Sequence, residues 1–341
     1  MDFDPNLYLL FRMGVAALGL GELLVYLPFR ARLFGPVFDR RAWFASPLRR
    51  DLFLAAWALG LLGLLLGVQP LLAAVLVVVC TRVAFVEARQ ANLLRGAGAV
   101  GLVPWFCAVW ILLFEATFVV FGPESPLVET ILDVARTHTG VMLLCAGICK
   151  CAAGYFERQG FEYALANPFW SWHWRWIRHV PPRSWWVVPL NLSLSVGEVV
   201  MGLALIVPWV APLGAALAAF GYIGLFLVLK LLLLPLAFAA LGVLFASPVL
   251  GASWLAAELG GSGLLPGAWA WPFQVALWLV LAVLVATKVV QYANYYFDHR
   301  FSDRVQQAAE RIALLGPELI WRVFTADLVD FFVRIHVREG D

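Results

Sequence analysis

Charged side chains that stand inside long apolar segments are the residues of this sequence that could do chemistry. Lys150 lies in the apolar stretch 146–154, and Glu198 lies in a later one. Ionisable groups are costly within a bilayer, so they usually face the interior of a helix bundle and often serve function. An amine removed from water can lose its proton and act as a base, and a carboxylate can orient it. We therefore predict Lys150 and Glu198 as the catalytic pair.

Helical spacing places both side chains on inward faces. Four small residues share the helix face of Lys150, at three and four positions on either side: Ala146, Gly147, Ala153 and Gly154. Small faces favour close helix packing in membranes. The later segment carries a polar stripe that ends in glycine: Asn191, Ser195, Glu198 and Gly202. Two interpretations stay equally open, an ion pair that only locks two helices and a pair that binds or transforms a ligand.

Other charged residues of the apolar segments are not predicted to be catalytic. Arg12 and Glu22 lie in the first segment, and Lys288 lies in the last. Polar residues follow Lys288 at helical spacing, which is typical of an interfacial face: Gln291, Tyr292, Tyr295 and His299. Three more charges are expected near the membrane surface, within reach of headgroups: Arg82, Glu115 and Lys230. Cys149 and Cys151 cannot share a helix face, and no metal site is predicted.

A tryptophan-rich segment between the fifth and sixth apolar segments is a candidate ligand wall. The candidate cofactor-binding residues all fall within it: Trp170, Trp172, His173, Trp174 and Arg175. Indole rings prefer the headgroup layer, and arginines there can contact lipid phosphates, so an interfacial belt is the more ordinary interpretation. The alternative is an aromatic wall for a ring-containing ligand.

The elements that must position these residues are membrane helices. Hydrophobic residues make up 63% of the 341 residues and charged residues only 13%, which excludes an ordinary soluble domain. A net charge of +2, without any basic arm, excludes a nucleic-acid partner. Nine apolar segments are expected to span a lipid bilayer: 7–27, 51–68, 70–88, 99–121, 139–156, 186–209, 212–229, 231–248 and 270–295. The segment 212–248 is too long for one straight crossing, and one bent helix or two helices would both fit.

The predicted fold class is therefore all-α, a polytopic bundle of transmembrane helices. Residues 1–295 form the transmembrane domain, which includes the Trp/Arg-rich loop 157–185, and residues 296–341 form an amphipathic tail along the cytoplasmic surface. Arginines after the first segment place that loop in the cytoplasm: Arg30, Arg32, Arg40, Arg41, Arg49 and Arg50. An acidic external loop is expected around Glu124, Glu129 and Asp133. Nine crossings then leave the N-terminus outside and the C-terminus inside.

The stretch AGICKCAAGYFERQGFEYAL, residues 146–165, resembles the lysine segment of vitamin K-dependent gamma-carboxylase and its bacterial relatives, the horizontally transferred transmembrane domain family. Looser similarity extends to Arg12 and Gly14, to Glu198, and to the stretch WRVF at 321–324. The resemblance implies that Lys150 matches the lysine held to deprotonate vitamin K hydroquinone. It also implies a quinone or hydroquinone as cofactor.

Two departures from that family limit what is expected. Cys149 stands where the carboxylase has a second lysine, and no histidine precedes His138 to match the catalytic histidine of an earlier span. The large lumenal domain that holds the peptide has no counterpart, so peptide carboxylation is not expected.

The leading functional prediction is a multi-pass protein of a bacterial inner membrane that binds a quinone or lipid-like ligand near Lys150. Glu198 would orient or tune the amine, and whether a reaction follows is left open. The alternative is a non-catalytic structural or assembly subunit, with membrane-protein partners contacting the Trp-rich loop and the tail. A small-solute transporter ranks third, because the sequence shows no internal repeat.

Overall fold

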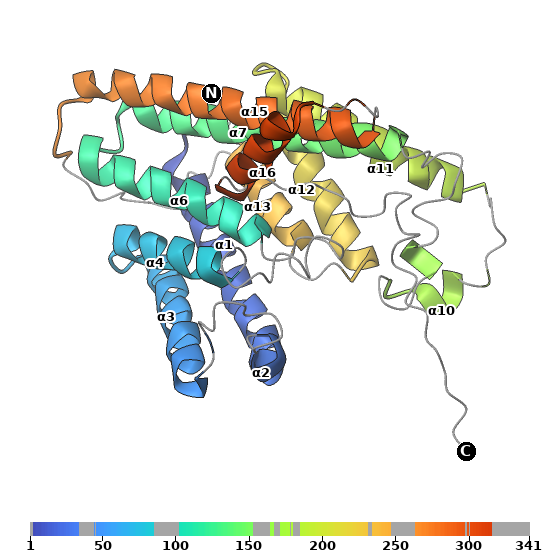
Figure 1. Cartoon of the computed structure of the whole chain (residues 1–341), viewed down its shortest axis with the longest axis horizontal. Helices are drawn as coiled ribbons and strands as arrows, with labels where there is room; N and C mark the ends of the chain where they lie inside the picture. Colours follow the sequence, from blue (N-terminus) through green and yellow to red (C-terminus); the bar gives the residue numbers. More distant parts are fainter. Residues whose placement is uncertain are drawn as a thin grey trace.

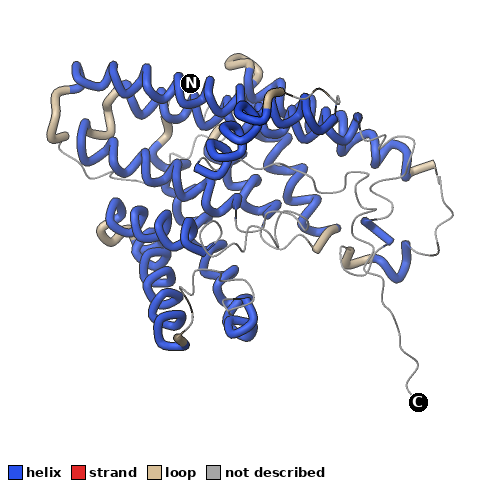
Figure 2. The backbone as a smooth tube through the Cα atoms, in the orientation of Figure 1, coloured by secondary structure: helices blue, strands red, loops and turns tan. Residues whose placement is uncertain are grey.

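Helices make up the described part of the molecule. The computed structural model describes residues 3–33, 44, 46–84, 102–152, 164–166, 171–177, 179, 185–230, 234–246, 263–296, 299 and 301–315. Within these ranges the only extended pairing is an isolated bridge between Ser171 and Leu229. Figure 2 shows the same result along the backbone, with helices joined by loops. The all-α prediction is confirmed.

Nine helices follow the nine predicted apolar segments in order. Their bounds are α1 Pro5–Tyr26, α3 Pro47–Leu66, α4 Pro70–Arg82, α6 Leu102–Phe121, α7 Pro126–Ala152, α11 Val187–Ile206, α12 Ala211–Val228, α13 Leu234–Leu244 and α15 Trp271–Tyr296. Shorter elements are η1 Leu27–Phe29, α2 Arg30–Leu33, α10 Trp174–Ile177, η3 Gly267–Ala270 and α16 Asp303–Leu315. α16 packs on α15, and the rest of the predicted tail lies outside the described residues.

Five helical segments of the described chain are long and apolar enough to cross a membrane: Pro5–Tyr26, Pro126–Ala152, Val188–Ile206, Ala211–Val228 and Gly267–Val290. Large apolar side chains are exposed on the outside of the bundle, among them Leu59, Leu227 and Leu279. Both features suggest a membrane protein surrounded by a lipid bilayer. The other apolar helices are shorter or carry more charge, so nine crossings stay a prediction.

The helices lie in two main directions. α7 and α15 run side by side along the long axis of the molecule, with α6 next to them, and α1 and α3 run across that axis (Figure 1). α3 ends at Leu66 and is capped by Gly67, whose φ of 69° lies in the left-handed region, and α4 begins at Pro70. This sharp turn lets α3 and α4 pack against one another.

α7 and α11 approach one another closely because glycines line their contact. A Cβ added at Gly147 would lie only 2.7 Å from the backbone oxygen of Ser195 and from the backbone nitrogen of Val199. Gly140 and Gly202 touch across the same contact. The prediction of close packing along the Lys150 face is therefore confirmed for its described residues; Ala153 and Gly154 lie outside them.

The long apolar segment 212–248 forms two helices, α12 and α13, which pack on one another. A Cβ added at Gly242 of α13 would lie 2.8 Å from the backbone oxygen of Ala215 in α12, so glycine sets the distance between these helices too. α12 ends before Lys230, near the predicted break.

The predicted start of the fifth segment, residue 139, is wrong. α7 begins at Pro126, so Glu129 and Asp133 belong to the helix instead of an external loop. The Ser125 hydroxyl accepts a hydrogen bond from the Leu127 amide at 3.3 Å, and proline suits the first helical position. Apolar residues in this first part are buried at helical spacing: Leu127, Val128, Ile131, Leu132 and Ala135.

Candidate functional site

Lys150 and Glu198 meet in the bundle interior. The Lys150 Nζ donates a hydrogen bond to Glu198 Oε2, and the two residues are only 4% and 3% exposed. Gly147 lies one turn before Lys150 and allows α7 to approach α11 at this level. The structure therefore brings the two predicted catalytic residues together as a buried ion pair. Its two charges compensate one another where water cannot.

The rest of the polar stripe on α11 supports the position of Glu198. Asn191 and Ser195 are buried on the same face, and the Ser195 hydroxyl donates to the Asn191 carbonyl oxygen at 2.9 Å. Tyr222 of α12 lies close enough to Glu198 to interact electrostatically. The Tyr222 hydroxyl is buried beside the Glu198 carboxylate, to which it can donate a hydrogen bond.

A cavity of about 810 Å³ adjoins this group; we call it the α11/α12 cavity. It lies between α11, α12 and five residues of the region before α11: Leu165, His173, Trp176, Ile177 and Trp186. Its walls are mostly apolar, and Glu198 and Tyr222 both contribute to them. Lys150 is not among the described residues that line it. Glu198 is thus the member of the ion pair that a molecule in the cavity would contact.

The Trp-rich segment contributes to the cavity wall through its attachment to the end of α12. Ser171 bridges to Leu229, and the Trp172 amide donates to the Val228 carbonyl oxygen at 3.3 Å. The His173 ring stacks on Trp176 with centroids 5.8 Å apart, and both side chains line the cavity.

The predicted ligand residues separate into different environments. His173 lines the α11/α12 cavity, whereas Trp172, Trp174 and Arg175 are not among its lining residues. Lys230 lies 5.2 Å above the Trp172 ring, and Arg175 lies 5.7 Å above the Trp174 ring, as cation–π pairs. Trp170 lies outside the described residues.

The two tryptophans that line the cavity, Trp176 and Trp186, were not among the predicted ligand residues. Trp176 follows His173 by three positions in a short helix, so helical spacing from His173 was the available signal.

A second buried charge cluster joins α1 to α6. Arg12 Nη1 lies 2.8 Å from Glu115 Oε1, and the Tyr8 hydroxyl donates to the same oxygen at 2.8 Å. The expectation that the Glu115 side chain reaches lipid headgroups is wrong, because the side chain is buried and paired with Arg12. Phenylalanine rings surround Tyr8 and exclude water from the pair: Phe3, Phe114 and Phe118.

The expectation of an interfacial face at Lys288 is also wrong. Lys288 is buried between α15 and α7, where it interacts electrostatically with His138, Cys145 and Cys149. Its helix packs along α7, so the side chain points into the bundle.

Arg136 is a further buried cation of α7 that the sequence did not single out. It pairs with Asp133 at 3.0 Å and donates to the Leu205 carbonyl oxygen at the end of α11. This contact joins the first half of α7 to the end of α11, the two helices that carry Lys150 and Glu198.

The described residues contain no group of three histidine, cysteine or acidic side chains that could hold a metal ion. Comparisons of the chain with protein-family models, with curated proteins and with solved structures find no match.

Proposed function

We propose that this protein is a multi-pass membrane protein that binds a ring-containing, lipid-soluble ligand of the quinone class in the α11/α12 cavity. The observation that carries the proposal is that Glu198 pairs with Lys150 and also lines an apolar cavity. Apolar walls with a few convergent polar groups are typical of small-molecule sites.

The wall chemistry fits a ring that carries oxygen substituents. Trp176, Trp186 and His173 provide flat surfaces for a ring, and apolar residues of α11 and α12 surround the remainder. The Glu198 carboxylate can accept a hydrogen bond from a ligand hydroxyl, and the Tyr222 hydroxyl can donate to a carbonyl. A quinone presents the carbonyls and its hydroquinone presents the hydroxyls.

In this proposal the base is Glu198, and Lys150 is a positioning residue. A hydroquinone hydroxyl beside Glu198 would transfer its proton to the carboxylate, and the Lys150 ammonium would compensate the charge left on the ligand oxygen. This assignment changes the role implied by the resemblance to the carboxylase family, where the matching lysine is the base. Membership of that family is part of the proposal.

We place the protein in a bacterial inner membrane, with nine crossings, the N-terminus outside and the C-terminus inside. The support is the arginine-rich loop after the first helix and the coincidence of nine helices with nine apolar segments.

Filling the cavity tests the proposal without disturbing the helix contacts. A Cβ added at Gly224, which lines the cavity, would meet no atom within 4 Å, and the same holds at Gly14 of α1, outside the cavity. Gly224→Leu should therefore occupy ligand space, and Gly14→Leu is the matched control. Binding of menaquinone-1 by purified protein is measured by tryptophan quenching, because Trp176 and Trp186 lie in the wall.

We expect saturable quenching in the parent protein and in Gly14→Leu, with at least tenfold weaker binding in Gly224→Leu, about 1.4 kcal/mol. Extraction and mass spectrometry should also find less quinone in the purified Gly224→Leu protein. Equal affinity in the three proteins would rule out the cavity as the site. No saturable binding at all would favour the structural-subunit alternative, in which the ion pair only joins α7 to α11.

A further inference from the structure

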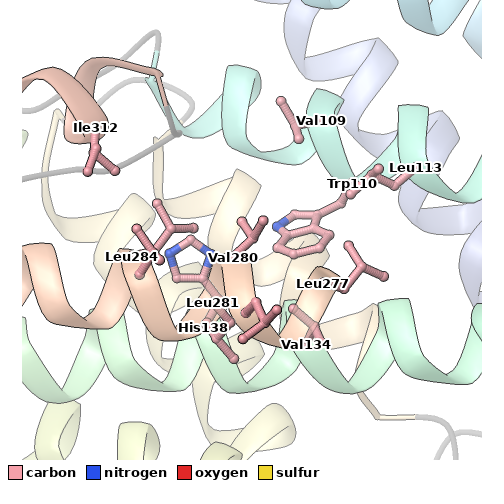
Figure 3. Close-up of a pocket in the computed structure, with 12 residues that line it drawn as sticks. Val109, Trp110, Leu113, Val134, His138, Leu277, Val280, Leu281, Leu284 and Ile312 are labelled. Carbon is pink, nitrogen blue, oxygen red and sulfur yellow. The ribbon is translucent and has the colours of Figure 1, made fainter. Parts of the chain in front are cut away.

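A second cavity, of about 490 Å³, lies between α6, α7 and α15; we call it the α6/α15 cavity. It shares no lining residue with the α11/α12 cavity. Its walls are aliphatic except for Trp110 of α6 and His138 of α7, and Ile312 of α16 contributes to the rim (Figure 3). Its volume lies within the roughly 300–1,000 Å³ that ligand pockets occupy.

Two described lining residues of this cavity carry polar groups, the His138 ring and the indole N–H of Trp110, and the indole N–H is a hydrogen-bond donor. The Trp110 side chain is buried, and its Nε1 has no hydrogen-bond partner in the described ranges. The indole nitrogen lies on the side of the ring that faces Val280 and His138 (Figure 3). Indole can only donate a hydrogen bond, and a buried donor without an acceptor costs free energy. A ligand that supplies an acceptor oxygen would remove that cost.

A buried lysine, Lys288, lies behind the part of the cavity lined by His138 and Leu284. The His138 ring packs edge-on against Trp110, with centroids 6.1 Å apart, and it interacts electrostatically with the buried side chain of Lys288. Lys288 stands one helical turn after Leu284, which lines the cavity. An anionic acceptor near Trp110 would favour the protonated form of this buried lysine and be attracted by it.

We propose that the α6/α15 cavity binds a long-chain fatty acid. Its carboxylate accepts the Trp110 N–H on the side nearest Lys288, and its alkyl chain lies along Leu277, Leu281 and Leu284. A quinone ring fits less well, because it lacks the anionic group and these walls are aliphatic instead of flat. A phospholipid tail alone would leave the indole N–H without an acceptor. The inference is independent of the quinone proposal.

Photolabelling tests this inference on the full chain in phosphatidylcholine nanodiscs. The probe is a palmitate analogue with a diazirine in its alkyl chain, and the labelled peptides are identified by mass spectrometry. Val280→Trp should fill the cavity from its open side, because Val280 lines it and is 55% exposed. Val275→Trp is the matched control, since Val275 is on the same helix, is 50% exposed and does not line the cavity.

We expect saturable labelling of α6 and α15, displaced by excess palmitate and reduced at least tenfold in Val280→Trp but not in Val275→Trp. Trp110→Phe keeps an aromatic ring without the N–H and should weaken palmitate binding about tenfold. Hexadecanol should compete at least tenfold less well than palmitate. Equal competition by hexadecanol would overturn the fatty-acid assignment. Labelling that does not saturate, or that Val280→Trp leaves unchanged, would overturn the site itself.

Discussion

Replacing Lys150 by methionine should destabilise the protein strongly, because it leaves a carboxylate buried without its cation. Glu198 is 3% exposed, and its described ion-pair partner is Lys150. Removing one partner of a buried pair costs about 3–5 kcal/mol, so we expect about 3 kcal/mol for Lys150→Met and a similar value for Glu198→Gln. Methionine keeps the length of the side chain, so lost packing contributes little.

The double variant separates the charge effect from any loss of contact. Lys150→Met with Glu198→Gln buries no charge, and uncharged replacements of buried pairs are often neutral, so we expect a cost of about 1 kcal/mol. Two single costs of about 3 kcal/mol and a double cost of about 1 give a coupling of about 5 kcal/mol, which is far outside the roughly 0.5 kcal/mol error of additivity.

The measurement is reversible unfolding of the purified protein in mixed micelles, with rising SDS fraction and circular dichroism as the readout. Ile148→Met is the control, because Ile148 is on the same helix turn and is 42% exposed on its outer face. Its stability should stay within about 0.5 kcal/mol of the parent. Additive single effects, or single effects below about 1 kcal/mol, would refute a desolvated ion pair.

The same double variant separates the two roles of the pair. If Glu198 contacts the ligand, the double variant folds but binds menaquinone-1 at least tenfold less well than the parent. If the pair only locks α7 to α11, the double variant binds as the parent does. That second result would end the assignment of Glu198 to the site.

Two more predictions test the packing of the bundle by the same unfolding assay. Gly147→Ala should lower the free energy of unfolding by about 1–3 kcal/mol, because its Cβ meets backbone atoms of α11. Gly14→Ala is the control: its Cβ meets nothing within 4 Å, so it should be neutral or stabilise by up to about 1 kcal/mol. Equal effects of the two variants would contradict the close approach of α7 and α11. Glu115→Leu should lower the free energy of unfolding by about 3–5 kcal/mol, because it leaves Arg12 buried without its carboxylate. Adding Arg12→Met should restore most of that stability. A double variant as unstable as Glu115→Leu would contradict the buried ion pair.

Hydropathy and periodicity in the sequence were enough to predict the inward faces of Lys150 and Glu198 and the order of the long apolar helices, although not the start of α7. Glycine and alanine around Lys150 indicated a close contact, and the polar stripe on the later segment supplied a carboxylate at a matching face. The hydrogen bond between the two side chains then follows from packing α7 against α11.

Hydropathy alone could not predict which charges are buried. Glu115 and Arg12 are far apart in sequence, and Glu115 is buried because α1 packs against α6 and places Arg12 and Tyr8 beside it. Lys288 likewise is buried because α15 packs along α7. A window along the chain measures local polarity, whereas burial of a charge depends on a partner from another helix.

The orientation of loop aromatics was also beyond the sequence pattern. Trp172 and His173 are neighbours, but only His173 lines the cavity, because the Trp172 backbone is tied to the end of α12 and its ring lies under Lys230. A short loop has no fixed period that would assign successive side chains to one face.

The glycine contacts between α7 and α11 bear on why a charged pair lies there at all. Close backbone approach at Gly140, Gly147 and Gly202 already joins the two helices, and a buried ion pair is weak evidence for stability because desolvation offsets its attraction. Joining α7 to α11 therefore does not by itself require the Lys150–Glu198 ion pair. The proposed function gives Glu198 a second role, as a contact for a ligand in the cavity. No other acidic residue is among the described residues that line this cavity. In the proposed function, Lys150 supplies the opposite charge beside that carboxylate and holds it in position for proton transfer from a ligand hydroxyl.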